Sequence, residues 1–532
     1  MIAAIANAAW LAASSPAWAR FLRALRNPQA AQQEVLSAMI ARNALCAYGR
    51  AHRFDSICNY QQFRERVPIV EYETLEPWVH RVMKGEQGVL TTDSVTRLVP
   101  TGGSSGGRKL IPYTASFQRQ MNAAIGPWMF DLAREYPAIV GGSAYWSISP
   151  SLPETSDPSA VPIGFDDDSS YLGGVAQKLA EATFAVPNAL RLVRDVETSR
   201  YLTLLFLLRQ RGLRLVSVWH PSFLALMLDA LCASWDELLA DVKNGGCRRA
   251  GGLPAKVRAC ISAEPMRQRA SELRSLAPSD IHGIWPRLKV VSCWGDAQSA
   301  LPQAELRKRL PGISIQNKGL LATEAVVSIP FHGRHPLAIR SHFFEFENSR
   351  GDVLLAHELC EAEQYSVIVT TGGGLWRYRL GDIVEVDGFV GRTPSIRFLG
   401  RGGSTSDLCG EKLTEVFVTR AIAEACEGCS FAPSFALLAP ERCASGPSHY
   451  TLFCDGRFPE SFARVLDDWL RKNPHYALCR DLGQLAPLQC CSVQTGSYFR
   501  VGIEAGQRIG DIKPRALSPR TDLRTAVFAD AG

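Results

Sequence analysis

The chain has 532 residues, of which 46% are hydrophobic and 21% are charged. A chain of this length is too long to fold around one compact core. The composition excludes wholesale disorder, collagen-like repeats and coiled coil. The formal net charge is +6 with no dense block of Lys and Arg, which disfavours a nucleic-acid-binding protein. We therefore expect a catalytic globular protein of several domain-sized units.

The first predicted element is a helix at the amino end. Residues 1–19 carry no charge and superficially resemble a signal peptide, but they lack a basic first part and are interrupted by Pro16. We interpret them as a helix that opens the first domain and continues into residues 20–85, which have helical spacing and a turn at 66–68. Residues 136–153 are also free of charge, but their Gly, Pro and Ser exclude a membrane span.

The middle of the chain alternates between helix and strand patterns. A short strand at 97–100 is expected to meet a Gly/Ser-rich loop, and the apolar period of residues 220–244 predicts one long helix ended by Gly245. Residues 288–294 form an apolar run typical of a buried strand. Further strand-like segments then crowd together at 313–316, 324–331, 352–356, 365–371 and 382–387.

The segment 401–406 is the best linker in the chain. After it we expect a small module with helices at 411–426 and 459–472 and strands at 431–438, 449–454 and 488–494. The predicted fold class is α/β: a large multi-subdomain body over residues 1–400, followed by a small α+β C-terminal lid over residues 401–532. The hinge is placed near residues 401–405.

The fifteen cysteines are an odd number scattered without a repeating interval. Cys426-x-x-Cys429 has no second CxxC at the distance of a zinc ribbon. We interpret the cysteines as buried or free thiols, which indicates a reducing compartment and predicts a cytoplasmic protein. A redox or metal role for Cys426 and Cys429 is the less favoured alternative.

Residues 101–109, TGGSSGGRK, are the first segment that carries chemistry. Glycines allow backbone N–H groups to turn towards a polyphosphate, hydroxyls add donors, and Lys109 adds a positive charge. A Walker A loop is excluded because Arg108 separates Gly107 from the lysine. Taken alone, this segment does not distinguish a phosphate loop from a flexible surface loop.

Two carboxylates are the next candidates. Asp382 follows a glycine turn between two expected strands, where a carboxylate can accept two hydrogen bonds from a ribose diol. Glu324 stands at an expected strand start, where it could hold Mg²⁺ against phosphate oxygens. Turn aspartates and solvated glutamates are common, so each signal is weak by itself.

In their order along the chain, these segments resemble the adenylate-forming enzymes, which include acyl-CoA synthetases, peptide-synthetase adenylation domains and luciferases. TGGSSGGRK resembles their [ST]-x-G-[ST]-[ST]-G-x-x-K phosphate loop, LLATE stands in place of Tyr-Gly-x-Thr-Glu, and YRLGD resembles the ribose-binding Gly-Asp. Arg401 followed by GEKLTE is similar to the hinge and early lid. The closest resemblance is to the auxin-responsive acyl-acid amido synthetases, and it rests further on WDELLADVKNG, IWPRLKVVSCW, VTTGGGLWRYRLGDIVEVDGF and GDIKPR.

The resemblance implies a ligase that uses ATP and Mg²⁺ to convert a carboxylic acid into an acyl-adenylate, releasing pyrophosphate. The amine of an amino acid then attacks, which yields an amide and AMP. The expected partners are thus small-molecule carboxylic acid and amino acid substrates, with no nucleic acid and no membrane. The sequence predicts no oligomeric state.

The resemblance also implies roles for individual residues. The implied ATP-binding residues are Thr101, Ser104, Ser105, Gly106, Lys109, Thr323, Asp382 and Arg401. Glu324 is implied to hold the metal at the α-phosphate and to serve catalysis. Lys412 and Lys513 are both candidate catalytic lysines of the lid, where either could neutralise the α-phosphate.

Three positions depart from the family pattern. Gly102 replaces a hydroxyl residue in the loop, Leu320 replaces a tyrosine that commonly stacks on adenine, and Arg108 adds a charge. Two other functions stay open: an acyl-CoA ligase with a thiol acceptor, and a non-catalytic sensor of nucleotide or acid. The ligase is disfavoured because the chain lacks a Pro-Lys-Thr-x-Ser-Gly-Lys tail, and the sensor because the candidate charged residues are retained.

Overall fold

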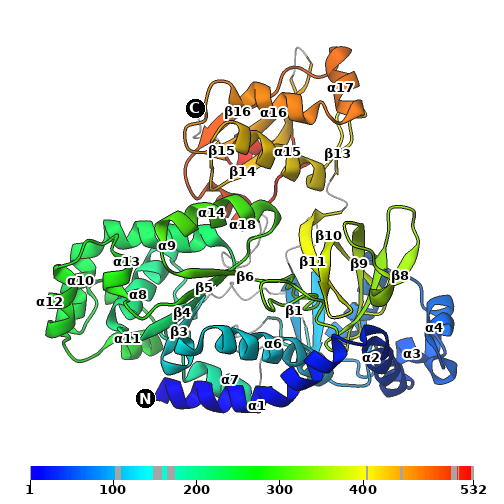
Figure 1. Cartoon of the computed structure of the whole chain (residues 1–532), viewed down its shortest axis with the longest axis horizontal. Helices are drawn as coiled ribbons and strands as arrows, with labels where there is room; N and C mark the ends of the chain where they lie inside the picture. The colour runs from blue at the N-terminus through cyan, green and yellow to red at the C-terminus, as the bar shows by residue number, and fades with distance from the viewer. Residues whose placement is uncertain are drawn as a thin grey trace.

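Figure 1 shows the computed structural model of the chain, which describes residues 2–101, 109–147, 159–164, 174–402, 405–443, 447–504, 512 and 514–528. A wide body with two lobes occupies the lower part of the view, and a smaller C-terminal domain lies above it (Figure 1). This α/β architecture confirms the fold class expected from the sequence. The predicted boundary and hinge near residue 401 stay predictions.

The amino end is helical, as predicted. Its helices are α1 (Ile2–Ala24), α2 (Pro28–Asn43), α3 (Ala47–Ala51), α4 (Tyr60–Arg66) and α5 (Tyr72–Met83). Asn27 caps α2 by accepting a hydrogen bond from the Ala30 N–H, and α1 packs along α6 (Ala115–Glu135) (Figure 1). Within the described part of the chain, no helix has the length and apolarity needed to cross a bilayer.

One lobe of the body is built on a parallel four-stranded sheet. Its strands, in spatial order, are β3 (Ser143–Trp146), β4 (Leu213–Ser217), β5 (Val290–Cys293) and β6 (Ser314–Asn317). Helices and turns between the strands cover the sheet: α7 (Gly174–Glu181), α8 (Val196–Arg209), α9 (Pro221–Ala233), α10 (Trp235–Asn244), α11 (Ala255–Ile261), α12 (Arg267–Arg274), α13 (Ile281–Ile284), α14 (Ala300–Arg309) and the 3₁₀ turns η4 (Asn188–Leu192), η5 (Arg248–Ala250) and η6 (Ala297–Ser299). Because all four strands run parallel, their carboxyl ends share one edge.

The single helix predicted over residues 220–244 is wrong. The chain leaves helical geometry at Ser234 (φ −109°, ψ 16°), so that α9 and α10 are separate helices. The predicted helix end at Gly245 is confirmed, since Gly245 has a φ of +75° and its backbone N–H donates to the Asp241 carbonyl at the end of α10.

The other lobe is a five-stranded antiparallel sheet. Its strands, in spatial order, are β11 (Thr393–Arg401), β10 (Tyr378–Val390), β9 (Gln364–Thr370), β7 (Phe343–Glu347) and β8 (Val353–Leu355). The strands predicted at 352–356 and 365–371 are confirmed, and 382–387 is the centre of the longer β10. The antiparallel pair β1 (Val95–Thr101) and β2 (Lys109–Thr114) flanks residues 102–108, which lie outside the described residues.

The strand predicted over residues 324–331 is wrong. This segment makes only isolated bridges, such as those of Val326 to Leu321 and of Ser328 to Leu337. Its backbone donors bond to scattered partners: the Val326 N–H donates to His342 Nε2 at 3.2 Å, the Val327 N–H to the Leu320 carbonyl at 2.9 Å, and the Ile329 N–H to the Pro336 carbonyl at 3.2 Å. A segment whose donors are satisfied in this way does not need a neighbouring strand.

The C-terminal domain has its own hydrophobic core and is α+β, as predicted. Its elements are β12 (Thr405–Ser406), β13 (Leu413–Thr414), α15 (Glu415–Gly428), β14 (Ala436–Glu441), β15 (His449–Asp455), α16 (Phe462–Leu470), α17 (Pro474–Asp481), β16 (Gln489–Val493), α18 (Ser497–Glu504) and α19 (Leu523–Ala526). The sheet order is β14-β15-β16, with β16 parallel to β15. α15 starts later than predicted because Thr414 caps it, its Oγ1 accepting from the Phe417 N–H.

All fifteen cysteines are free thiols. In the described ranges, no group of three or more His, Cys, Asp or Glu side chains is placed to hold a metal ion. Cys426 is buried, and burial raises the pKa of its thiol to about 12. A protonated, inaccessible thiol is unreactive, so the structure offers no support for a redox role of Cys426.

Acid is expected to destabilise the fold through a buried histidine. His342 is fully buried, its Nε2 accepts from the Val326 N–H, its Nδ1 lies 3.0 Å from Gln120 Oε1, and burial lowers its pKa to about 3. An unfolded histidine titrates near 6.5, so below that pH the unfolded chain binds more protons. We expect the free energy of unfolding to fall by about 2 kcal/mol between pH 7.5 and pH 5 from this residue alone.

Urea denaturation at pH 5, 6 and 7.5 measures this loss. The loss sets in as the pH falls below about 6.5, and the contribution is intact above it. His342→Gln is expected to flatten the pH dependence by that amount, whereas His475→Gln, at an exposed position, serves as the matched control. Equal pH dependence in the two variants would contradict the assignment.

Candidate active site

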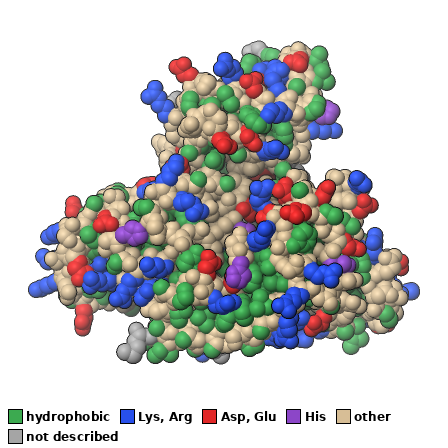
Figure 2. All heavy atoms as spheres, in the orientation of Figure 1, with side chains coloured by type: hydrophobic (Ala, Val, Ile, Leu, Met, Phe, Trp, Pro, Cys, Tyr) green, Lys and Arg blue, Asp and Glu red, His purple; other side chains and the backbone are tan. Residues whose placement is uncertain are grey.

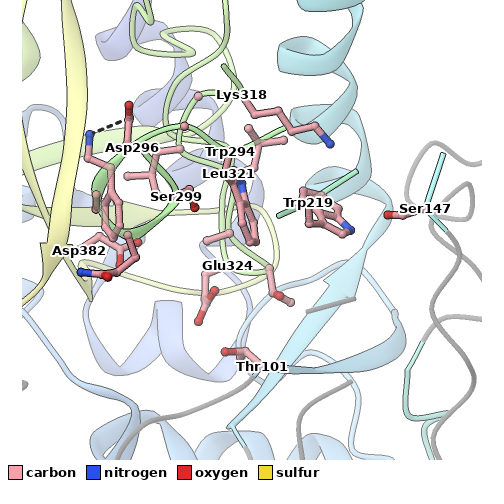
Figure 3. Close-up of a pocket in the computed structure, with 18 of the residues that line it drawn as sticks. Thr101, Ser147, Trp219, Trp294, Asp296, Ser299, Lys318, Leu321, Glu324 and Asp382 are labelled. Carbon is pink, nitrogen blue, oxygen red and sulfur yellow. Dashed lines mark hydrogen bonds between the residues drawn. The ribbon is translucent and has the colours of Figure 1, made fainter. Parts of the chain in front are cut away.

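A cavity of about 270 Å³ lies where the two lobes and the C-terminal domain meet. Figure 3 shows ten labelled side chains around it, drawn from the parallel-sheet lobe, from the end of β1, from β10 and from the loop between β6 and β7. On the face shown in Figure 2, Lys and Arg side chains are interspersed with Asp and Glu.

The carboxyl ends of β4 and β5 form an aromatic wall of the cavity. Trp219 and Trp294 follow these strands, and their ring centroids lie 5.4 Å apart. Lys318 follows β6 and places its Nζ 4.4 Å from the Trp219 ring centroid, although only 4% of this lysine is exposed. Ligands of open α/β sheets bind outside the carboxyl ends of the strands, which is where these three residues lie.

Asp382 forms the opposite wall and is nearly inaccessible, with 1% of its surface exposed. The register of β10 and β11 pairs it with Arg401, whose Nε donates to Asp382 Oδ1 at 3.1 Å. The second oxygen, Oδ2, has no hydrogen-bond partner among the described residues. A buried carboxylate oxygen without a donor costs about 1–3 kcal/mol, so this atom is suited to a donor from a ligand.

The local backbone around Asp382 differs from the turn that the sequence predicts. Asp382 lies within β10, at a bulge where the pairing with β9 shifts between Arg379 and Ile383. Gly381, with a φ of +82°, allows the bulge. The bulge turns the carboxylate out of the ladder and into the cavity.

A second carboxylate shares the guanidinium of Arg401. Glu324 lines the cavity and is 4% exposed. The pKa of Arg401 is raised, first by Asp382 and also by Glu324. Burial, with a further contribution from Glu324, likewise raises the pKa of the Tyr378 hydroxyl. Asp382 and Glu324 thus place two carboxylates near Arg401, and Lys318 and Arg515 are the other basic side chains among the described residues that line the cavity.

The C-terminal domain closes the cavity with α15 and the chain after residue 513. Glu415, Thr419, Pro514 and Arg515 line it from this side. Gln298 Nε2 donates to Thr419 Oγ1 at 2.9 Å and so connects η6 to α15. Burial lowers the pKa of Arg515, and Glu415 opposes that shift.

The structure brings five of the predicted site residues to the cavity: Thr101, Thr323, Glu324, Asp382 and Arg401. Lys109 begins β2 opposite Thr101, with its Nζ 5.7 Å from the Tyr72 ring centroid, and is not among the lining residues. Lys412 is exposed and does not line the cavity either. Ser104, Ser105, Gly106 and Lys513 lie outside the described residues, and all these roles stay predictions.

Sequence patterns missed the wall formed by Trp219, Trp294 and Lys318. Each follows a strand of the parallel sheet, and the signal for Trp294 was the end of the buried run 288–294. β4 was not predicted, so nothing indicated that the ends of three strands converge.

The fold of the chain is similar to that of a solved acyl acid amido synthetase. A solved structure of AtGH3.15 acyl acid amido synthetase in complex with 2,4-DB superposes with a TM-score of 0.84 at 19% identity, over 97% of this chain and 96% of that one. Models of the GH3 family N-terminal, central and C-terminal domains match residues 17–315, 335–401 and 416–521. The chain belongs to the GH3 family, which confirms the family predicted from its motifs.

Curated relatives match over most of their length. Indole-3-acetic acid-amido synthetase GH3.2 of Arabidopsis thaliana is 25% identical over 435 residues, covering 75% of this chain and 79% of the relative. The probable indole-3-acetic acid-amido synthetase GH3.4 of Oryza sativa subsp. japonica is 25% identical over 565 residues, covering 93% and 87%.

Proposed function

We propose that this protein is an acid–amino acid ligase. It converts a carboxylic acid and ATP into an acyl-adenylate and pyrophosphate, and it then transfers the acyl group to the amine of an amino acid with release of AMP. Membership of the GH3 family and relatives named as amido synthetases support this function. The single observation that carries it is the buried Asp382 carboxylate at the cavity wall, ion-paired to Arg401, whose second oxygen has no hydrogen-bond donor among the described residues.

Asp382 is suited to the ribose of ATP. Vicinal hydroxyls are two adjacent donors, and a carboxylate can accept from both. The ion pair with Arg401 holds the carboxylate in place, and Asp382 in turn raises the pKa of the guanidinium. We therefore propose that the ribose lies between β10 and the C-terminal domain.

Glu324 is the described residue best suited to Mg²⁺, because hard cations take oxygen ligands and this carboxylate is buried at the cavity wall. When bound, the ion would neutralise charge on the phosphate oxygens. Thr323 and Lys109 are proposed to contact the phosphates, as the resemblance implies. The chain's own contribution is position and charge, since both reacting groups come from the substrates.

The acyl group is proposed to lie against the apolar wall of the cavity. Met121, Ile125, Trp128, Phe184 and Trp219 line this part. Such a surface favours a carboxylic acid with a hydrophobic or aromatic body, since burying apolar area releases about 25 cal/mol per Å². An adenylate held here is sheltered from water by the contact between η6 and α15.

Exchange of labelled pyrophosphate into ATP tests the first half-reaction. Purified protein with MgATP and a panel of aryl and alkyl carboxylic acids is expected to exchange with at least one hydrophobic acid. Amide formation on adding amino acids then supports the proposal. Turnover with coenzyme A but not with amino acids would instead assign an acyl-CoA ligase, and ATP binding without exchange across the panel would assign a sensor.

Paired variants decide which lid lysine acts in the chemistry. Lys513→Ala is expected to slow exchange about 100-fold, because one cation at a developing charge contributes a few kcal/mol to the transition state. ATP affinity is expected to change less than about threefold, since the interaction strengthens only in the transition state. Lys412→Ala, at an exposed position, is the matched control, and a larger loss there would transfer the role to Lys412.

A further inference from the structure

A second cluster of reactive side chains lies in the C-terminal domain, outside the cavity. Cys443 is exposed and follows β14, and its Sγ lies 3.6 Å from Nδ1 of His449. Nε2 of the same imidazole lies 3.2 Å from Oε2 of Glu441. Thiol, imidazole and carboxylate thus form one continuous hydrogen-bonded chain, the arrangement that activates a nucleophilic sulfur.

Strand pairing holds the imidazole and the carboxylate in place. Glu441 ends β14 and stands directly opposite His449, the first residue of β15, in the antiparallel register. Only 9% of the His449 side chain and 13% of the Glu441 side chain are exposed. The base and its orienting group therefore lie on rigid elements, and the exposed member of the chain is the sulfur.

The protonation of the imidazole follows from the partners of Glu441. Arg524 donates to Glu441 Oε1 at 2.7 Å through Nε and to Oε2 at 2.9 Å through Nη2, and Thr451 Oγ1 donates to Oε2. Burial by itself would raise the pKa of Glu441, but these hydrogen bonds lower it overall. An ionised carboxylate only accepts, so the imidazole directs its Nε2 proton to Glu441 and its free Nδ1 lone pair to the thiol.

Other exposed cysteines are placed differently. Cys360 Sγ lies 4.0 Å from the Glu358 carbonyl, and Cys409 Sγ lies 3.7 Å from the Gln484 carbonyl. A carbonyl can only accept, so it keeps the proton on sulfur. Among the described residues, a thiol in hydrogen-bond contact with an imidazole is recorded for Cys443 alone.

We propose that Cys443 is a nucleophilic thiol and a site of reversible oxidation by peroxides, with His449 as the base and Glu441 as a positioning residue. The thiol proton moves to Nδ1, and the thiolate attacks one peroxide oxygen. A sulfur–oxygen bond forms and the oxygen–oxygen bond breaks. The imidazolium returns its proton to the leaving oxygen, which departs as water when the oxidant is hydrogen peroxide. Sulfur is oxidised to a sulfenic acid, the peroxide is reduced, and a small thiol can then restore the cysteine through a mixed disulfide.

This site is separate from the adenylation cavity. The opposite end of β14 adjoins the body, where Ser222 Oγ donates to the Ser434 carbonyl at 3.3 Å. Cys443 follows the other end of the strand, about 20 Å away at a rise of about 3.3 Å per residue. Cys443→Ser is therefore expected to leave pyrophosphate exchange unchanged, and the proposal does not depend on the proposed ligase function.

Site-resolved alkylation of the full-length protein tests the proposal. With limiting iodoacetamide at pH 7, peptide mass spectrometry is expected to show Cys443 reacting about tenfold faster than Cys360, because an ordinary thiol is only a few per cent ionised at that pH. After brief treatment with hydrogen peroxide, dimedone is expected to label Cys443 ahead of Cys360. Rates within twofold of each other, or no preferential dimedone label, would overturn the proposal.

Variants of His449 and Glu441 test whether the reactivity of Cys443 comes from the imidazole or only from the exposure of the thiol. His449→Gln is expected to lower the Cys443 rate to that of Cys360, which serves as the standard within the same molecule. Glu441→Gln is expected to lower the rate severalfold, since the imidazole loses the carboxylate that orients it. An unchanged tenfold preference in His449→Gln would overturn the role of the imidazole. The ratio of the Cys443 rate to the Cys360 rate in the wild-type protein tests the reactivity of Cys443 whether or not either variant folds.

Discussion

Replacing Asp382 by alanine is expected to weaken ATP binding at least about 100-fold and to reduce pyrophosphate exchange by the same factor or more. Hydrogen bonds to a charged group contribute about 1.5–3 kcal/mol each, and the carboxylate is proposed to accept two from the ribose. The variant also leaves the Arg401 guanidinium without its partner at 3.1 Å. Isothermal titration with ATP and the exchange assay measure the two losses.

Asp387→Ala is the matched control for this variant. Asp387 lies on the same strand as Asp382 but is exposed, so its removal changes the net charge equally without touching the cavity. We expect it to bind ATP like the wild type. Thermal unfolding of both variants separates a loss of binding from a loss of fold. If a folded Asp382→Ala variant binds ATP normally, the proposal that Asp382 binds the ribose is wrong.

The motifs were the part of the site that sequence could predict. Asp382, Glu324 and Arg401 were each weak candidates, and their order along the chain predicted that they belong to one site. The structure brings all three to the wall of one cavity. Their chemistry is carried by charged residues in glycine-rich segments, and such residues are visible without knowledge of the topology.

The apolar and aromatic half of the cavity was not predictable in this way. Trp219 and Trp294 lie 75 positions apart in the sequence and meet because β4 and β5 are parallel neighbours. An aromatic residue after a buried run is ordinary core composition, and nothing local distinguishes a ligand wall from packing. Strand pairing decides whether such a residue lines a ligand site or packs in the core, and a single sequence does not show which strands pair.

The errors in secondary structure have the same origin. Residues 324–331 have strand composition, yet their backbone donors bond to the His342 side chain and to scattered carbonyls in place of a neighbouring strand. Residues 220–244 keep a helical period across Ser234, but α9 packs on α14 while α10 packs on α12. Tertiary contacts override local pattern in both cases.

Arg377 shows how a family motif can carry stability rather than chemistry, and its removal is expected to cost about 3–5 kcal/mol of unfolding free energy. The guanidinium is 5% exposed and donates to Glu345, which is 1% exposed, with the shortest contact at 2.7 Å. It also donates to the carbonyls of Arg64 and Val67, which fastens α4 to the antiparallel sheet. Arg377→Met fills similar volume but leaves a buried carboxylate whose one remaining side-chain donor is Tyr60.

Urea denaturation of Arg377→Met measures this cost. The matched control is Arg397→Met, which removes an exposed partner of Glu385 on the neighbouring strands and is expected to cost less than about 1 kcal/mol. The double variant Arg377→Met/Glu345→Leu is expected to recover part of the loss, because it removes the stranded charge. If Arg377→Met costs no more than Arg397→Met, the pair is not buried in solution. A large loss with recovery in the double variant would instead assign Arg377, the first arginine of the sequence WRYRLGD, to holding the amino-terminal helices against the strand that presents Asp382.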